Sequence, residues 1–211
     1  MIEFRPLGIE DYVERNSKPL SRSLEKLWLE TFGMGHSAKL RMWALEAEFL
    51  KMLVLMTGAR RILQLGLFTG LSALAFAEAL PRDGHVIACD NDRENTEFAK
   101  RHFAESPQGY KIQIKLLPAA TFVKVVTGPF DICFINADKE NYSAYYDACM
   151  ELTRPKGLIL LDNMVMSGNV IEPGDDAARA LNALNQRIRT DPRVENVLLP
   201  VRDGLMVVYK L

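Results

Sequence analysis

The chain has 211 residues, a length that suits one globular domain better than two. Its 26 Lys and Arg residues nearly balance 27 Asp and Glu residues, so the formal charge is −1. This balance excludes a strong electrostatic attraction to nucleic acid or to an anionic membrane. The three cysteines are an odd number, and no signal-peptide pattern or membrane-spanning apolar run is seen. We therefore expect a cytoplasmic protein.

Two helices are predicted before the first strand. Apolar residues recur at three- and four-residue steps from Ile9 to Phe32, which predicts one polar, amphipathic helix. A break over residues 34–37 follows, and a second helix is predicted from Met42 to Met56, with Gly58 as its stop signal. Residues 1–57 are thus expected to form a helical attachment to an α/β core over residues 58–211.

The core alternates short apolar runs with helical patterns, which is typical of parallel strands joined by crossover helices. We predict a single domain over residues 1–211: a doubly wound, Rossmann-like α/β fold with a seven-stranded, mostly parallel sheet and a C-terminal antiparallel strand. The predicted strands are Arg61–Leu65, His85–Cys89, Ile112–Leu117, Phe130–Ile135, Leu158–Leu161, Val194–Pro200 and Leu205–Lys210. The predicted helices of the core are Leu71–Leu80, Arg93–Phe103, Thr121–Val126, Tyr142–Leu152 and Ala177–Arg189.

The turn after the first strand is a candidate cofactor site, because ligands of open α/β sheets bind at the carboxyl ends of the strands. It reads Gly66-Leu-Phe-Thr-Gly70, with Ser72 at the start of the next helix. Glycines there allow close approach of a ligand, although the same pattern also makes an ordinary tight turn. Asp90, at the end of the second strand, is placed to accept hydrogen bonds from a ribose, or else to cap a helix. The turn lacks the middle glycine of a dinucleotide site, so S-adenosylmethionine fits better.

A second cluster follows the fourth and fifth predicted strands. Asn136 and Lys139 come after the fourth strand, and Asp162 and Asn163 come after the fifth. If these strands are neighbours, Asp162, Asn163 and Asn136 can offer oxygen ligands to Mg²⁺ or a similar cation. Lys139 can then act as a base once its surroundings lower its pKa. Each of these residues alone is ordinary turn or surface chemistry.

These residues resemble the class I, cation-dependent O-methyltransferases that include the catechol and caffeoyl-CoA enzymes and bacterial relatives. The resemblance covers most of the chain, and its most specific element is the run from Asn136 to Tyr142 followed by Asp162-Asn163. The other matching segments are Met42–Leu50, Ile62–Gly70, Asp90, Phe130–Ile135, Gly157–Leu161 and Leu199–Leu205.

The resemblance implies an enzyme that transfers a methyl group from S-adenosylmethionine to a hydroxyl group of a small catechol-like or phenolic acceptor. It implies Lys139 as the general base and a divalent cation, with Mg²⁺ favoured, that binds neighbouring acceptor oxygens. Relatives are commonly dimers, so a homodimer is expected. The implied metal ligands are Asn136, Asp162 and Asn163. The implied cofactor-binding residues are Met42, Gly66, Phe68, Ser72, Asp90, Ala119, Asn136 and Tyr145.

Three positions depart from the family pattern. Gln64 stands where the family usually has Glu, Asn136 where it has Asp, and Leu117 where it often has Gly. Gln64 accepts a hydrogen bond from the cofactor ammonium less strongly than a carboxylate does. Asn136 leaves one carboxylate among the expected metal ligands, so we expect weak metal binding that substrate tightens, with Asp138 as a candidate for the missing charge.

Several other residues have an ordinary structural interpretation. His36, His85 and His102 lack partners at metal-ligand spacing, so we interpret them as structural or solvated. The aromatic and methionine residues of the N-terminal region can line the acceptor pocket or pack on the sheet; these are Trp28, Trp43, Met34 and Met42. The loops 35–41 and 164–174 are expected to shape the acceptor pocket.

Three further functions are weighed against a small-molecule O-methyltransferase. One is methylation of a tRNA nucleoside, for which a local patch of Lys100, Arg101, Lys111 and Lys115 would be needed. Another is a family member that keeps the fold and the cofactor but has lost catalysis. A nicotinamide-dependent dehydrogenase is disfavoured by the first turn.

Overall fold

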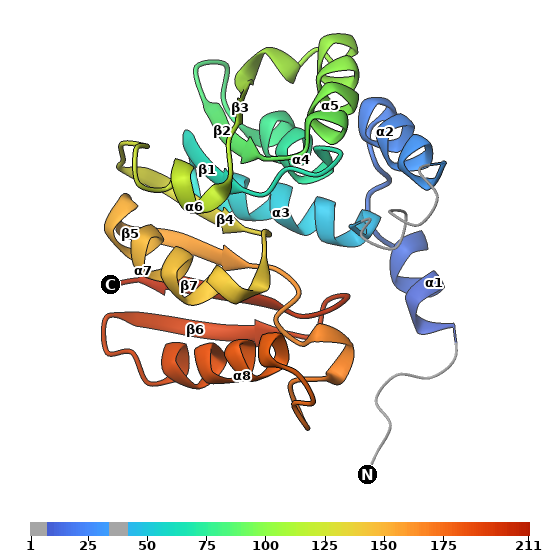
Figure 1. Cartoon of the computed structure of the whole chain (residues 1–211). Helices are drawn as coiled ribbons and strands as arrows, with labels where there is room; N and C mark the ends of the chain where they lie inside the picture. Colours follow the sequence, from blue (N-terminus) through green and yellow to red (C-terminus); the bar gives the residue numbers. More distant parts are fainter. Residues whose placement is uncertain (1–7, 34–41) are drawn as a thin grey trace.

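The centre of the protein is a seven-stranded sheet with the strand order β3-β2-β1-β4-β5-β7-β6 (Figure 1). This computed structural model describes residues 8–33 and 42–211. All neighbouring strands are parallel except that β7 runs antiparallel to both β5 and β6. The predicted Rossmann-like fold is thereby confirmed. The strands are β1 (Arg61–Leu65), β2 (His85–Asp90), β3 (Ile112–Leu116), β4 (Phe130–Ile135), β5 (Thr153–Leu161), β6 (Val194–Leu199) and β7 (Leu205–Lys210).

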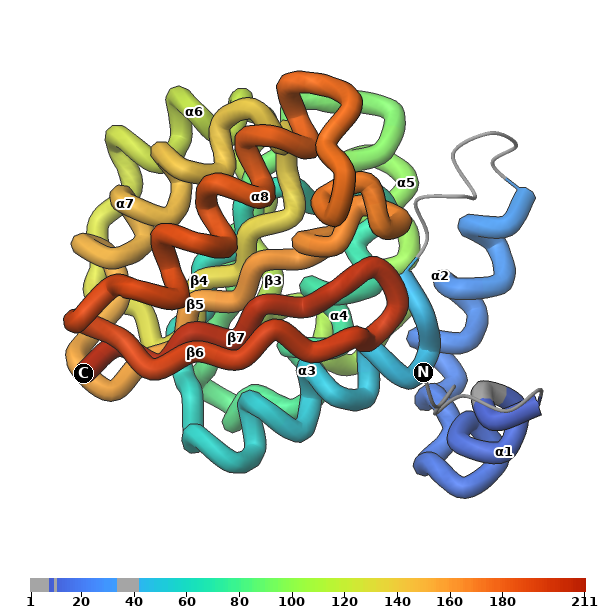
Figure 2. Tube along the Cα trace, turned by 90° about the horizontal axis from the view of Figure 1, so that it is seen from below, coloured from blue at the N-terminus to red at the C-terminus, as the bar shows by residue number. Residues whose placement is uncertain are grey.

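Helices cover both faces of the sheet, which is why the central strands are apolar on both sides (Figure 2). One apolar cluster joins the sheet to α3 (Ala44–Thr57), α4 (Leu71–Ala79) and α5 (Arg93–Glu105). A second cluster joins the other face to α6 (Ala119–Phe122), α7 (Tyr142–Leu152) and α8 (Asp176–Arg189). Short 3₁₀ helices are η2 (Gly109–Lys111), η3 (Lys139–Asn141) and η4 (Met166–Gly168).

The N-terminal segment forms two helices instead of the single predicted one. They are α1 (Ile9–Arg15) and α2 (Arg22–Phe32). The sequence between them contains Pro19, which disfavours a helical conformation at the residue before it. Ser21 then begins a new helix, because its side chain accepts a hydrogen bond from the backbone N–H of Leu24 at 3.2 Å. The apolar spacing continued across this break, so periodicity alone did not reveal it.

Helix α2 is attached to the core by buried apolar and polar contacts. Leu24 and Leu27 are fully buried against the first apolar cluster. Trp28 donates a hydrogen bond from Nε1 to the carbonyl of Met42 at 3.1 Å. Trp28 therefore helps to hold the start of α3, and it does not line the main cleft described below.

Two further boundaries differ from the prediction. Strand β5 begins at Thr153, five residues before the predicted start at Leu158, because Thr153 pairs with Phe130 of β4. A salt bridge between Arg154 and Asp131 at 2.5 Å supports this polar extension. Helix α6 is shorter than predicted and begins at Ala119. Within the described residues, no helix has the length and apolar character that a membrane crossing requires.

Candidate active site

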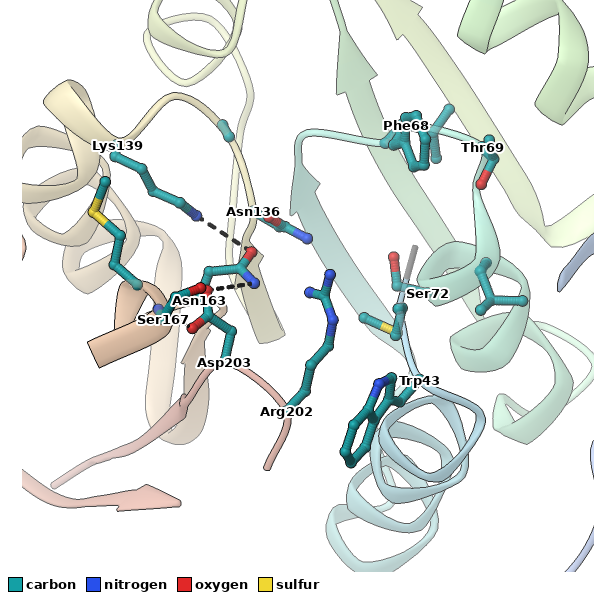
Figure 3. A pocket seen from close by; sticks show the side chains of 15 residues that line it. Trp43, Phe68, Thr69, Ser72, Asn136, Lys139, Asn163, Ser167, Arg202 and Asp203 are labelled. Carbon is teal, nitrogen blue, oxygen red and sulfur yellow. Dashed lines mark hydrogen bonds between the residues drawn. The ribbon is translucent and has the colours of Figure 1, made fainter. Parts of the chain in front are cut away.

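A cleft of about 660 Å³ opens at the carboxyl ends of the central parallel strands (Figure 3). It contains six of the predicted site residues: Met42, Phe68, Ser72, Asn136, Lys139 and Asn163. Trp43, Met166 and Ser167 also line it, so one of the two predicted pocket loops contributes. The other expected loop, 35–41, and the residues Met34 and His36 lie outside the described residues. Sequence reasoning did not identify the remaining lining residues, which are Leu67, Thr69, Leu71, Ala137, Arg202 and Asp203.

Gly66 lets the ends of β1 and β4 approach each other. Its φ is +86°, and a Cβ atom there would lie 1.9 Å from the carbonyl oxygen of Asn136. The backbone N–H of Asn136 donates to the carbonyl of Leu65 at 2.8 Å. Only glycine fits this position, so Gly66 shapes the cleft from below without lining it.

Asp90 holds the turn that follows Gly66. Its Oδ2 accepts hydrogen bonds from the backbone N–H groups of Leu67 and Phe68, each at 2.8 Å. Its Oδ1 accepts one from the backbone N–H of Asp92 at 2.9 Å. These bonds support Phe68 in a left-handed conformation with φ +51°. Asp90 lies beside the cleft, and its predicted contact with a ribose stays a prediction.

Gln64 lies buried behind Ser72. Its Nε2 donates to the carbonyl of Gly66 and to the hydroxyl of Ser72, both at 2.9 Å. The other end of the amide, Oε1, is buried and has no hydrogen-bond partner. A buried acceptor without a donor is costly, so this oxygen is suited to a donor supplied by a ligand.

Lys139 extends from η3 into the cleft. Its Nζ donates to the hydroxyl of Tyr142, to the carbonyl of Asp162 at 3.2 Å and to Oδ1 of Asn163 at 3.5 Å. Burial lowers the pKa of Lys139 to about 8, although the charges of Asp162 and Asp203 oppose this shift. A pKa near 8 allows the amine to lose its proton close to neutral pH, as a general base requires.

Asp162, Asn136 and Asn163 meet because β4 and β5 are neighbours, which is the condition on which the expected metal site depended. Asp162 is only 1% exposed. Its Oδ2 accepts from Nδ2 of Asn136 at 2.8 Å, and its Oδ1 accepts from the backbone N–H of Asn163 at 2.6 Å. Burial raises the pKa of Asp162, and the positive charges of Lys139 and Arg202 partly offset this rise.

Glu46, in the first turn of α3, is a buried acid that the sequence analysis did not identify. Its exposed fraction is 0%, and neither carboxyl oxygen has a hydrogen-bond partner. Burial raises the pKa of Glu46 well above its usual value, and the neighbouring Asp162 raises it further. The available signal was an acidic residue on the apolar side of the helix, next to the buried Ala47 and one turn before the buried Leu50.

Arg202 and Asp203 enter the cleft from the turn between β6 and β7. Figure 3 shows the Arg202 guanidinium pointing into the space between Asn163 and Ser72. The Asp203 carboxylate accepts from the backbone N–H of Ser167 and from Nδ2 of Asn163 at 3.5 Å. The sequence analysis matched Leu199–Leu205 to the family but gave Arg202 and Asp203 no role, because only the fold brings this turn to the end of β5.

Two predicted cofactor-binding residues do not reach the cleft wall. Ala119 and Tyr145 belong to the second apolar cluster. The Tyr145 hydroxyl donates to Oδ1 of Asp138 at 2.7 Å, and Asn141 donates to Oδ2. Both oxygens of Asp138 are thus engaged by these neighbours, and its expected contribution of the missing charge stays a prediction.

The structure also gives the positions of His85, His102 and two lysines of the possible basic patch. His85 and His102 do not line the cleft, and Nε2 of His102 lies 3.2 Å from a carboxyl oxygen of Glu30. Lys111 is buried and donates to two backbone carbonyls, while Lys100 pairs with Glu97. Burial thus removes Lys111 from the basic surface that a tRNA substrate would need.

Comparison with known proteins shows the family to which this chain belongs. The O-methyltransferase family model matches residues 14–211. A caffeoyl-CoA O-methyltransferase of Zea mays is 38% identical over 79% of this chain and 68% of its own length. A catechol O-methyltransferase domain-containing protein of Mus musculus is 36% identical over 92% of this chain and 75% of its own length. The solved O-methyltransferase from Bacillus cereus, in complex with SAH, is 25% identical with a TM-score of 0.87, covering 97% of each chain.

The fold and these similarities place the chain among the Rossmann-like methyltransferases. It belongs to the O-methyltransferase family and is an S-adenosylmethionine-dependent O-methyltransferase.

Proposed function

We propose that the chain methylates a hydroxyl group of a small phenolic acceptor with two neighbouring hydroxyls, with Lys139 as the general base and a divalent cation in support. The convergence of Lys139 and Asn163 on the cleft that also contains Ser72 carries this proposal, together with the contact of Lys139 Nζ with the carbonyl of the buried Asp162. The relatives named for caffeoyl-CoA and catechol point to the same acceptor class.

The cofactor part of the proposal rests on the polar groups around Ser72. Gln64 Oε1 is a buried acceptor without a donor, and an amino acid ammonium group fits this need. Phe68 and Met42 offer apolar contacts in the same cleft. S-adenosylmethionine, when bound, supplies the methyl group.

Lys139 is proposed to take the proton of the acceptor hydroxyl at Nζ. The resulting oxygen attacks the methyl carbon, whose bond to sulfur breaks, so that S-adenosylhomocysteine is released. Asn163, which contacts Lys139 Nζ, is placed to orient the reacting hydroxyl beside the base. Trp43 lines the same cleft and offers an aromatic surface to a phenolic ring.

The donor chemistry of the site fits a hard cation. Asp162 offers a carboxylate, and Asn163 and Asn136 offer amide oxygens, which suits Mg²⁺ when acceptor oxygens complete the coordination. A bound cation would lower the pKa of the acceptor hydroxyl and orient it. Within the described part of the chain, no three His, Cys, Asp or Glu side chains gather as a metal cluster. We therefore expect weak binding that the acceptor strengthens.

Calorimetry with S-adenosylmethionine, combined with a methyl-transfer assay on a catechol, tests this function. We expect cofactor binding, transfer to one hydroxyl, and a loss of transfer on adding a chelator that Mg²⁺ restores. Cofactor binding without transfer to any phenolic acceptor would point to a member that has lost catalysis. Transfer that ignores the chelator would remove the cation from the proposal.

We further propose that the enzyme is a cytoplasmic homodimer. Its cysteines, Cys89, Cys133 and Cys149, are free and buried, which suits a reducing compartment. Large apolar side chains on α2 and α3 are exposed, and a second copy of the chain is the proposed partner that covers them. They are Leu29, Phe32, Met52, Leu55 and Met56.

A further inference from the structure

Two carboxyl groups from distant parts of the chain meet below the cleft. Glu46 comes from the first turn of α3, and Asp162 comes from the residue that follows β5. Their exposed fractions are 0% for Glu46 and 1% for Asp162. Each acid acts on the pKa of the other, so the two carboxyl groups lie close together.

Two carboxylates this close together require a proton or a cation between them. Two carboxylates are both acceptors, so they can share only a proton or a cation. Glu46 has no donor on either oxygen. Arg202 is close enough for its charge to act on both acids, yet it donates no hydrogen bond to Glu46. Burying a carboxyl with both oxygens unsatisfied is costly unless a ligand repays that cost.

The expected metal site beside Asp162 has one negative charge fewer than the family pattern. Asn136 stands there as a neutral amide and contacts Asp162 at 2.8 Å. A half turn of this amide would replace Nδ2 by Oδ1 and present a second oxygen beside the carboxylate. Asp138 points its two oxygens at other partners, the Tyr145 hydroxyl and the Asn141 amide.

We propose that Glu46 is a metal ligand of this enzyme and, with Asp162, supplies the second carboxylate that Asn136 lacks. The inference rests on the cation of the proposed function and adds a ligand to it. Two carboxylates neutralise a divalent cation, and this number is usual for protein-bound Mg²⁺. The ion would lie between α3 and the end of β5, so metal binding would tie the N-terminal helices to the catalytic cleft.

The alternative is a purely structural role. Glu46 is at the third position of α3, counted from its N-cap Trp43, where a glutamate can accept a hydrogen bond from the N-cap backbone N–H. That bond is not formed with good geometry, since both oxygens lack a partner. A helix cap predicts a loss of stability without metal on substitution, and a metal ligand does not.

Titration of the metal-stripped protein with Mn²⁺ alone, followed by calorimetry and by the electron paramagnetic resonance of free Mn²⁺, tests the proposal. We expect Glu46→Gln to weaken Mn²⁺ binding roughly ten- to hundredfold, on the scale of supporting residues at metal sites. Glu48→Gln is the matched control, because this acid is on the same helix and pairs with Lys51 at 2.9 Å. Its Mn²⁺ affinity should equal that of the wild type.

A rescue variant keeps the test independent of folding. Asn136→Asp returns a carboxylate to the other side of Asp162, so Glu46→Gln combined with Asn136→Asp should bind Mn²⁺ more tightly than Glu46→Gln alone. Thermal unfolding without metal should show Glu46→Gln at least as stable as the wild type, while its stabilisation by Mn²⁺ is lost.

The outcomes separate this inference from the function on which it rests. If the wild type binds Mn²⁺ and Glu46→Gln binds it equally well, Glu46 is not a ligand and the proposed function stands. If Glu46→Gln is unstable without metal but keeps its Mn²⁺ affinity, Glu46 is a helix cap. If the wild type binds no Mn²⁺ even with S-adenosylmethionine present, the cation and this ligand both fail.

Discussion

At the scale of single residues, the site depends on polar groups that the fold removes from water. Lys139, Asp162 and Gln64 are each buried or nearly so, and burial changes the pKa or the hydrogen bonding of each side chain. Burial lowers the pKa of Lys139 to about 8, and it leaves Gln64 Oε1 without a partner. The same residues at the surface would be ordinary solvated side chains.

Replacing Lys139 should stop transfer without preventing cofactor binding. We expect Lys139→Met to lower kcat by about 10² to 10⁴, because this is the usual contribution of a positioned base. Lys139→Arg should be similarly impaired, since a guanidinium keeps the charge and does not release its proton. Single-turnover transfer and calorimetry with S-adenosylmethionine measure the two effects. Substantial activity in Lys139→Arg would show that the lysine contributes charge alone.

Alanine substitutions at Gly66 and Gly58 separate the cost of a positive φ from the cost of a steric clash. Both have positive φ, but a Cβ at Gly66 would meet Asn136 at 1.9 Å, whereas nothing lies within 4 Å at Gly58. Gly58→Ala should lower the free energy of unfolding by about 1 to 2 kcal/mol, and Gly66→Ala by about 2 to 5 kcal/mol. Urea unfolding measures both. Equal losses would mean that β1 and β4 separate easily at the cleft.

At the scale of elements, α2 and α5 are joined by the buried side chain of His102. It lies beside Glu30 of α2 and against the ring of Phe98, with ring centroids 4.7 Å apart. Burial lowers the pKa of His102, although the charges of Glu30 and Glu105 oppose this effect. The neutral imidazole is therefore part of the folded interface.

The stability of the protein should fall on mild acidification because of His102. Its pKa in the folded protein is below the value of about 6.5 in the unfolded chain, so the unfolded chain binds more protons as the pH falls through this range. The stabilisation is complete above pH 6.5 and is lost below it. We expect His102→Gln to show a smaller decrease in Tm than the wild type between pH 7.5 and 5.5. An unchanged slope would place the sensitive group elsewhere.

At the scale of the whole molecule, the N-terminal helices both complete the cleft and expose apolar surface. The start of α3 lines the cleft through Met42 and Trp43. On the same helix, Met52, Leu55 and Met56 are 49%, 61% and 65% exposed. Their spacing of three and four residues puts them on one face, which suits contact with a second copy.

Charged residues on this face should separate the proposed dimer. We expect the double variant Leu55→Glu with Met56→Lys to elute as a monomer, while its unfolding free energy changes by less than about 1 kcal/mol, because exposed substitutions are usually mild. Size-exclusion chromatography with light scattering measures the mass. A wild-type protein that is monomeric at all concentrations would contradict the proposal.

Local patterns predicted most of the fold because they follow from burial along each element. The strand ends after β1, β4 and β5 were located correctly, and so were the residues that come together there. The break between α1 and α2 was missed because apolar spacing continues past Pro19. The true start of β5 was missed because Thr153 and Arg154 are extended by pairing with β4, a contact distant in sequence.

The sequence was sufficient for the fold class, since the alternation of strands and helices is visible in short segments of the chain. It also located Asn136, Lys139, Asp162 and Asn163, because these residues follow directly after the ends of two strands. It was not sufficient for Glu46 and Arg202, which reach the site from α3 and from the turn before β7. Their importance depends on burial and on charges that arrive from other elements, and burial of a polar group is a property of the packed molecule. For the same reason Asp138, which looked suitable in the chain, is engaged by its neighbours in the fold.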